Sequence, residues 1–594
     1  MRNFVFILLF ISTISVWSQP EQTVNGLLDL EKKVTYWDKD SSHKRSEGYL
    51  KVYGFGGVGE QYGKWKYYFK DGYFEEVANF YAGKYNGQVI QYHPNHVKKF
   101  VGYFYLGVPD SISRVYYDNG LVAEEGMYNS IPDSIRDTTS KYWNVIEFLP
   151  PVKIGKWKTY YEDGKPWEVY NYKPNDTTAY LLDFYTRDSV HQVLNGNGVI
   201  KETFYSGKPK LETTFKNGLR NGKYAEWNPN GRKKIEGEYV DGLKSGDWVH
   251  YFLNTDRVHQ RISYLEGMKH GPFEDYMPND TLSIKGAYLD DLKDGLWTYY
   301  FENGQIDMTG EFKNDLQEGH WQYYYPTGQL YYEGDYKSGK KDGAWQFYYG
   351  NGQLWREGSY RDDEKDGIWN TYYENGGDLM SGSYDKGKQH GAWTSWYENG
   401  QEKDMGSFDQ GKMTARWTGW FPNGKMNYEG NYERDMKVGN WKFYTSKGKL
   451  KDDGNFKILS TKGEESTYVF TQIEEQSYKQ GSWKSYSEVD GKLVSEGSYN
   501  RGRQTGSWKY YYPGGKVVAY ENSYNNKGKL DGVSKTYTRR GKLNGEVHYK
   551  NGLKHGDVKT WDAKGKNLIQ HLVYKNGVKV KDELNNISYK YKKG

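Results

Sequence analysis

The segment GAWQFYYGNGQLWREGSY at residues 343–360 is the clearest copy of a phrase that recurs every 24 residues. We number its positions from the opening glycine, so that Gly343 is position 1, Trp345 position 3 and Gly358 position 16. Between residues 295 and 447 the period is constant, and position 3 is occupied by Trp297, Trp321, Trp345, Trp369, Trp393, Trp417 and Trp441. A fixed period of this length is typical of solenoids and other repeat arrays.

The phrase predicts a β-hairpin. Positions 9 and 10 are usually Asn-Gly, as at 351–352 and 399–400, and the flanking residues are rich in Trp, Tyr and Phe. Asn-Gly favours a two-residue type I′ turn, aromatic residues favour strands, and no helical period is present. We therefore expect an all-β fold, an elongated antiparallel β-meander or solenoid of about nineteen hairpin repeats of ~24 residues.

The predicted turn also predicts which residues face one another. Position 3 should face position 16, so that Trp345 fills the space left by the missing side chain of Gly358. Position 7 should face position 12, as Tyr349 and Leu354 would. Position 6 should point to the opposite side of the sheet.

The copies and their gaps divide the chain into segments. We expect a signal peptide at 1–18, an N-terminal cap at 19–62, repeats at 63–130, an interruption at 131–154, one repeat at 155–172, a second interruption at 173–197, regular repeats at 198–450, an extended repeat or insertion at 451–480, repeats at 481–577 and a C-terminal tail at 578–594.

The N-terminal residues are typical of an export signal. Arg2 precedes an apolar run from Phe4 to Ile11, and a short polar stretch follows. No later stretch has the ~18 apolar residues of a membrane helix, and the chain has no cysteine for a disulfide or a lipid thioether. We expect export to the periplasm, the outer surface or the medium, without a transmembrane anchor.

The charged residues are balanced and mixed. The chain has 82 basic and 77 acidic residues among 594, for a formal net charge of +5. No basic cluster stands out in the sequence, which argues against a nucleic-acid partner and against binding to an anionic lipid surface.

No catalytic or metal motif is evident. His93 and His96 could chelate a metal, but no third ligand follows nearby. The acidic loops at 290–294 and 362–366 contain lysine and lack the ligand alternation of a calcium loop, so we interpret them as solvated turns. We find no phosphate loop, nucleophile elbow or zinc motif. The sequence predicts no enzyme activity, no catalytic residue, no cofactor and no metal.

Aromatic residues at position 6 are candidate binding residues. These are Tyr300, Tyr324, Tyr348, Tyr372, Trp396 and Trp420. Their rings could stack on the sugar rings of a glycan. They could equally stack on one another, because a thin sheet has no other core.

The phrase resembles the MORN repeat in its bacterial, antitoxin-type variant form. The residues that carry the resemblance are Gly319, Trp321, Tyr324, Tyr325, Gly328, Gly334 and Tyr336. The resemblance implies an antiparallel β-meander with one hairpin per repeat, often a scaffold for protein or membrane contacts. Similar bacterial chains are labelled antitoxins, which implies a toxin partner.

We interpret the chain as an exported, non-enzymatic repeat scaffold that mediates protein or cell-envelope interactions. The alternatives are a glycan- or peptidoglycan-binding module that uses exposed aromatic rows, and antitoxin-like binding of a toxin partner. Because regular repeats are interchangeable, we expect partner contacts in the interruptions. Removing residues 343–366 should then preserve binding.

Overall fold

The computed structural model describes residues 30–52, 59–129, 152–174, 176–461 and 474–588. The signal peptide at 1–18, most of the interruption at 131–154, and parts of the cap, the insertion at 451–480 and the tail lie outside the described residues. The described residues form 45 strands and no helix, all in one antiparallel sheet. The prediction of an all-β antiparallel meander is therefore confirmed. No described segment is a helix long and apolar enough to cross a membrane.

The chain divides into two compact units, Met1–Leu292 and Lys293–Gly594. The first unit contains β1 (Leu30–Tyr36), β2 (Lys44–Lys51), β3 (Glu60–Tyr68), β4 (Phe74–Tyr81), β5 (Lys84–Tyr92), β6 (Lys98–Tyr105), β7 (Val108–Tyr116), β8 (Val122–Asn129), β9 (Val152–Tyr160), β10 (Pro166–Tyr172), β11 (Ala179–Tyr185), β12 (His191–Leu194), β13 (Asn197–Thr203), β14 (Pro209–Lys216), β15 (Leu219–Trp227), β16 (Lys233–Val240), β17 (Leu243–Tyr251), β18 (Val258–Leu265), β19 (Met268–Tyr276) and β20 (Leu282–Leu289), and the short β21 (Leu292–Lys293) follows.

The second unit contains β22 (Gly295–Tyr300), β23 (Ile306–Lys313), β24 (Leu316–Tyr324), β25 (Leu330–Lys337), β26 (Lys340–Tyr348), β27 (Leu354–Arg361), β28 (Glu364–Tyr372), β29 (Asp378–Asp385), β30 (Lys388–Trp396), β31 (Glu402–Asp409), β32 (Lys412–Trp420), β33 (Met426–Glu433), β34 (Met436–Tyr444), β35 (Leu450–Thr461), β36 (Glu474–Tyr486), β37 (Leu493–Asn500), β38 (Arg503–Tyr511), β39 (Val518–Tyr524), β40 (Gly532–Tyr537), β41 (Leu543–Lys550), β42 (Leu553–Trp561), β43 (Leu568–Lys575), β44 (Val578–Asp582) and β45 (Ile587–Ser588). Strands that follow one another in sequence pair with one another, as β25, β26 and β27 do.

The Asn-Gly turns differ from the predicted type. The Tyr349 N–H donates to the Gln353 carbonyl at 2.8 Å, and the Gly352 N–H donates to the Tyr349 carbonyl at 2.9 Å. Of the Asn-Gly pair only Gly352 has a positive φ, 86°. This geometry is a type I turn followed by a left-handed glycine, so the type I′ prediction is wrong here. Asn351 instead accepts the Gln353 N–H on its side-chain Oδ1 at 2.9 Å.

The longer turn changes the pairing beside it. Tyr348, at position 6, faces Leu354, so the predicted pairing of positions 7 and 12 is wrong. An irregularity at Trp355 then restores the predicted register, and Trp345 faces Gly358. The two deviations cancel because the longer turn takes one residue, Gly350, from the first strand, and the irregularity leaves one residue, Trp355, unpaired in the second.

Type I′ geometry occurs at the other end of the hairpins. Asp362 and Asp363 form a two-residue turn with φ of 50° and 69°. Asp363 Oδ1 accepts the backbone N–H of Lys341, at the start of β26, at 2.8 Å. This acidic loop is therefore a turn whose carboxylate is held by the neighbouring backbone.

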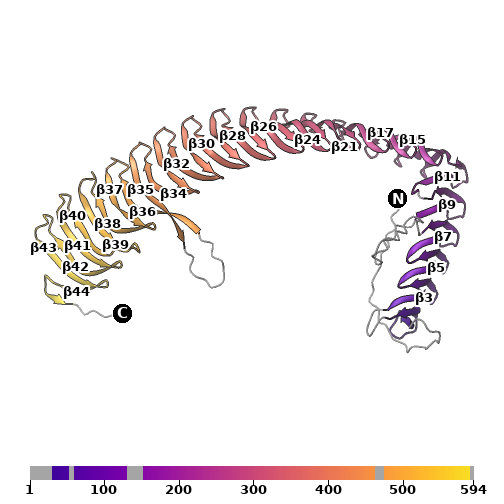
Figure 1. Ribbon diagram of the computed structural model, residues 1–594, viewed down its shortest axis with the longest axis horizontal. Coiled ribbons are helices and arrows are strands. Elements are labelled where there is room, and N and C mark those ends of the chain that lie inside the picture. The colour runs from indigo at the N-terminus through magenta and orange to yellow at the C-terminus, as the bar shows by residue number, and fades with distance from the viewer. Residues whose placement is uncertain (1–29, 53–58, 130–151, 175, 462–473, 589–594) are drawn as a thin grey trace, which may run out of the picture. The chain divides into compact units, whose positions relative to one another are not determined.

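Two of the sequence gaps contain sheet. The interruption at 173–197 holds β11 and β12, which pair in order between β10 and β13. In the insertion at 451–480, β35 and β36 reach 12 and 13 residues, and this hairpin extends beyond its neighbours in Figure 1.

A continuous spine of aromatic rings forms the core of the second unit. From Trp297 to Trp508, the indole at position 3 alternates with a Tyr or Phe at position 18, with ring centroids 4.9–6.3 Å apart and planes at 76–89°. Trp345 is 1% exposed, and its Nε1 donates to the Asp335 carbonyl at 3.1 Å. Edge-to-face contacts of this kind add to the burial of the rings.

The glycine at position 16 accommodates the indole of the next repeat. A Cβ on Gly358 would lie 2.2 Å from Cδ2 of Trp369, and one on Gly334 would lie 2.2 Å from Cδ2 of Trp345. Trp248 accordingly faces Ile262 within its own hairpin. The expectation that Trp345 fills the space over Gly358 is therefore wrong, although the two residues do face each other, because each ring leans toward the preceding hairpin.

Lysine side chains complete the cover of this aromatic face. Lys341 Nζ lies 4.4 Å from the centroid of the Trp345 ring, and Lys365 Nζ lies 4.1 Å from that of Trp369. Burial lowers the pKa of both ammonium groups. The lysine stems pack over the rings, so this face is closed by the chain's own side chains.

Candidate binding surface

The opposite face of the second unit, which we call the polar face, carries positions 2, 4, 6, 15 and 17. The predicted binding residues Tyr300, Tyr324, Tyr348, Tyr372, Trp396 and Trp420 each end a strand on this face, in β22, β24, β26, β28, β30 and β32, and all six are half-buried. They therefore form a row, with one ring in every repeat.

Most of the tyrosine hydroxyls in this row have partners within the sheet. The Tyr348 hydroxyl donates to Glu333 Oε1 at 3.1 Å, and the Tyr372 hydroxyl donates to Glu357 Oε1 at 2.9 Å. Burial, together with the charge of Glu333, raises the pKa of Tyr348 to about 12. Sequence reasoning missed the glutamates. Their signal was a Glu at position 15 followed by a Tyr fifteen residues later.

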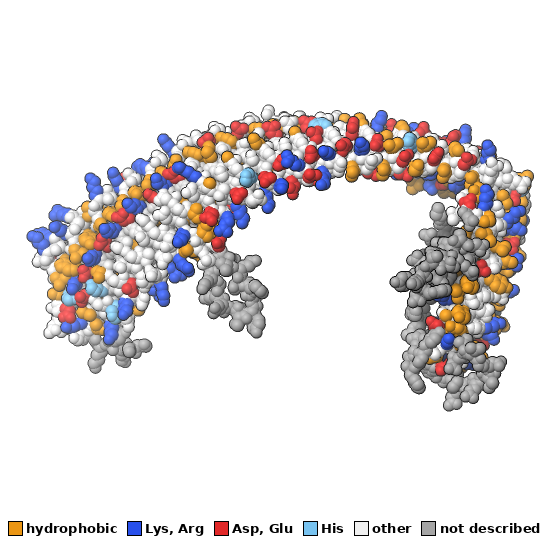
Figure 2. Space-filling model, in the orientation of Figure 1, with side chains coloured by type: hydrophobic (Ala, Val, Ile, Leu, Met, Phe, Trp, Pro, Cys, Tyr) orange, Lys and Arg blue, Asp and Glu red, His pale blue; other side chains and the backbone are white. Residues whose placement is uncertain are grey.

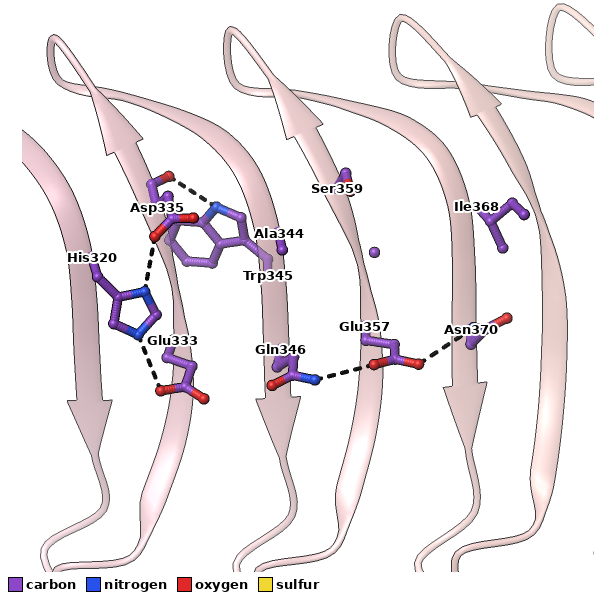
Figure 3. Close-up of a pocket in the computed structure, with 11 residues that line it drawn as sticks. His320, Glu333, Asp335, Ala344, Trp345, Gln346, Glu357, Ser359, Ile368 and Asn370 are labelled. Atoms are coloured by element: carbon purple, nitrogen blue, oxygen red, sulfur yellow. Dashed lines mark hydrogen bonds and ion pairs between the residues drawn. The ribbon is translucent and has the colours of Figure 1, made fainter.

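A depression of about 450 Å³ lies on the polar face across β24 to β28 (Figure 3). Its lining comes from positions 2, 4, 15, 16 and 17 of successive hairpins, with the Trp345 indole beneath: His320, Glu333, Asp335, Ala344, Trp345, Gln346, Glu357, Gly358, Ser359, Ile368 and Asn370. None of the six predicted residues is part of this lining. The depression is therefore a site that the sequence did not indicate.

Amide side chains fix the central carboxylate of the depression. Gln346 Nε2 donates to Glu357 Oε2 at 3.1 Å, and Asn370 Nδ2 donates to Glu357 Oε1 at 3.4 Å. Burial opposes ionisation of Glu357, but the hydrogen bonds from Gln346, Tyr372 and Asn370 outweigh it and lower its pKa. The carboxylate is thus ionised and held in one orientation.

His320 bridges two further carboxylates. Its Nδ1 lies 2.8 Å from Asp335 Oδ1, and its Nε2 lies 3.2 Å from Glu333 Oε2. Burial disfavours the imidazolium, but the two carboxylates outweigh burial and raise the pKa of His320. Both ring nitrogens donate in the protonated form, which suits these two acceptors.

No arrangement suited to a metal ion is found among the described residues. His96 Nε2 contacts Asp71 Oδ2 at 2.6 Å, whereas His93 Nε2 contacts the Tyr116 carbonyl at 3.0 Å. The two histidines have separate partners rather than a shared focus.

The depression differs from the same positions in later repeats. Farther along the unit, position 4 is lysine and lies near the glutamate: Lys442 Nζ is 3.9 Å from Glu429, and Lys484 Nζ is 3.7 Å from Glu496. Over β24 to β28 that position is an amide instead. The charge of Glu357 is therefore not neutralised by a lysine at position 4. Ile368, 64% exposed, adds an apolar contact at the rim.

Comparison with known families agrees with the repeat geometry. The MORN repeat variant matches residues 153–173, 293–314, 317–338, 341–362, 389–408, 413–434, 504–526 and 530–551. The chain contains MORN repeats of the variant type. The depression lies on the MORN repeats at 317–338 and 341–362 and on the hairpin that follows. MORN repeats at eight positions indicate a repeat scaffold.

Other comparisons add little. No curated protein matches the chain. Among solved structures, one described as "Crystal Structure of TcdB2-TccC3" is 12% identical to this chain, with a TM-score of 0.13. The match covers 93% of this chain and 32% of that one. The same complex without its hypervariable C-terminal region gives 12% identity, a TM-score of 0.12 and coverage of 93% and 31%. The chain thus spans less than a third of those chains, and scores this low support no inference.

Proposed function

We propose that this MORN-repeat chain is an exported, non-enzymatic scaffold that binds a protein partner on the polar face across β24 to β28. The observation that carries the proposal is the contrast between the two faces. The aromatic face is covered by its own rings and lysine stems. The polar face offers a depression with fixed, ionised carboxylates and amide groups.

The chemistry of the depression favours a peptide segment with cationic or amide side chains. Glu357 and Glu333 supply acceptors, and Gln346 and Asn370 supply donors that are already oriented. Ile368 supplies an apolar contact. Groups that are fixed before binding lose little conformational entropy when the partner arrives.

Export is part of the proposal and has its own test. The apolar N-terminal segment at 1–18 supports it. The full chain should be recovered outside the cytoplasm, and a chain that begins at residue 19 should remain inside. Equal distribution of the two forms would contradict export.

A single arginine at the rim of the depression should block the partner. We expect Ile368→Arg to reduce capture of the partner from an envelope extract at least about tenfold, because a long charged side chain would occupy the apolar rim. Leu296→Arg is the matched control, since Leu296 is also at position 2 and 63% exposed but lies outside the depression. Equal capture by the two variants would contradict the proposed site.

The glycan and antitoxin interpretations remain predictions, and the same two variants test them. A panel of neutral polysaccharides should bind equally to both variants if the position 6 rings carry recognition. A captured toxin lost only from the Ile368→Arg variant would support the antitoxin-like role at the depression.

A further inference from the structure

In the second unit, charge is segregated along the margin of the sheet that carries the turn between the two strands of each repeat. The five turns at 301–305, 325–329, 349–353, 373–377 and 397–401 contain three acidic residues and no basic one. The next six, at 421–425, 445–449, 487–492, 512–517, 538–542 and 562–567, contain three acidic and ten basic residues. We call these ten the basic margin: Lys425, Lys447, Lys449, Lys492, Lys516, Arg539, Arg540, Lys542, Lys564 and Lys566.

Direct contacts between successive turns make this margin continuous. Asn423 Nδ2 donates to the Ser446 carbonyl at 2.7 Å, and Lys449 Nζ donates to the Val489 carbonyl at 2.5 Å. Farther along, the Tyr512 hydroxyl donates to the Tyr537 carbonyl at 2.7 Å. Successive turns are two strands apart, or about 9.6 Å. Basic residues far apart in sequence therefore become neighbours.

Lysine stems pack on the glycines of the following turns. A Cβ on Gly491 would lie 3.3 Å from Lys449 Cδ, and one on Gly515 would lie 2.9 Å from Lys492 Cβ. In the earlier turns glutamine takes this place, as Gln305 does against Gly328. The stems of Lys449 and Lys492 are thus held against the following turn.

The cations of the margin are available to a ligand. Nine of the ten side chains are exposed, and Lys449 is half-buried. Within the described residues none of the ten forms an ion pair, while Glu488 pairs with Lys451 at 2.6 Å. Figure 2 shows Lys and Arg side chains gathered along the margin over β34 to β43. The expectation that no basic cluster stands out is therefore wrong, because the fold gathers residues that alternate with acidic ones in sequence.

We propose that the basic margin binds an acidic polysaccharide. A linear polyanion with regularly spaced charges matches a linear row of cations, and the match strengthens with the number of contacts. A hollow of about 280 Å³, lined by Tyr512, Pro513, Gly514, Lys516, Val517 and Arg539, lies on this margin. It provides two cations beside a tyrosine ring for one acidic sugar.

Other polyanions fit the margin less well. Single-stranded nucleic acid is bound by successive exposed aromatic rings, and the six turns contain only Phe421 and Tyr512, both half-buried. An anionic membrane is flat, whereas the margin is one turn wide and strand twist rotates it by about 20–25° per strand. A flexible polysaccharide can follow that twist.

Polygalacturonate, which carries one carboxylate per sugar, is a suitable probe, and its fully methyl-esterified form is the uncharged control. The margin variant combines Lys425→Gln, Lys449→Gln, Lys492→Gln, Lys542→Gln and Lys566→Gln. Glutamine occupies the place of the first four in earlier turns, as Gln305 does. The face variant removes the same charge at position 4: Lys442→Gln, Lys484→Gln, Lys509→Gln, Lys535→Gln and Lys559→Gln. Circular dichroism should show the same sheet in both.

We expect the parent chain to bind polygalacturonate in a salt-dependent manner and not to bind the ester. The margin variant should bind at least about tenfold more weakly, and the face variant within about twofold of the parent, because loss of direct contacts outweighs loss of net charge. Equal weakening of both variants would overturn the proposal. So would tighter binding of anionic lipid vesicles or single-stranded DNA by the parent at matched charge concentration. The depression variants leave this margin intact, so the two proposals can fail separately.

Discussion

Replacing Gly358 by alanine is expected to lower local stability by about 1–3 kcal/mol, although it adds only one methyl group. The new Cβ would lie 2.2 Å from the Trp369 indole, which is 3% exposed and cannot move into open space. Hydrogen exchange at the amides of β26 to β28 measures the free energy of local opening, which is the relevant quantity in a repeat array.

Gly350→Ala is the matched control in the same hairpin. Nothing lies within 4 Å of a Cβ at Gly350, and its φ is not positive, so the change should be neutral or slightly stabilising. Trp369→Val should relieve the cost of Gly358→Ala, since the native chain pairs Ala78 with Val89 at the equivalent places. If Trp345→Val relieved it instead, the assignment of the ring to the next repeat would be wrong.

Alkaline pH is expected to unfold the array through its tyrosines. Burial raises the pKa of Tyr348, Tyr372 and Tyr444 to about 12 from the ordinary value of 10.0, and a neighbouring glutamate adds to the shift in each case. The folded state therefore holds these protons more tightly than the unfolded state. This contribution to stability is complete below pH 10.0 and is lost as the pH rises through about 12.

Denaturant unfolding at increasing pH, with tyrosinate absorbance, checks this expectation. The triple variant Tyr348→Phe, Tyr372→Phe, Tyr444→Phe should show a shallower alkaline loss than the parent. Lys341 and Lys365 oppose the trend, because their lowered pKa makes their own contribution rise with pH up to 10.5. Native tyrosines that all ionise near pH 10.0 would contradict the account.

The repeat period was enough to predict the fold, because each tryptophan marks one hairpin. The Trp345–Gly358 register was also predictable, although two compensating deviations lie between these residues and the turn. The turn type was not, because the φ preference of Asn-Gly does not include the backbone hydrogen bond that the Asn351 side chain accepts. Which repeat supplies the ring over Gly358 depends on the direction in which each indole ring is tilted. Pairing alone cannot decide it.

The candidate surfaces were less predictable than the fold. The position 6 tyrosines could be found from their period, but their partners Glu333 and Glu357 belong to the preceding hairpin. The basic margin was hidden because its members are separated in sequence by acidic residues that point elsewhere. Both surfaces arise from contacts between repeats, which a reading of one repeat does not include.

Deletion of one repeat at two alternative places distinguishes recognition in the depression from recognition in the interruptions. Removing residues 343–366 or residues 391–414 takes out 24 residues in phase, so both variants should keep the sheet. The first deletion removes Gln346 and Glu357 from the depression, and the second leaves the depression intact. We predict that capture of the protein partner is lost in the first variant and kept in the second. This prediction replaces the expectation from the repeat pattern alone that binding survives removal of residues 343–366. Capture kept in the first variant would contradict the account and would place recognition in the interruptions.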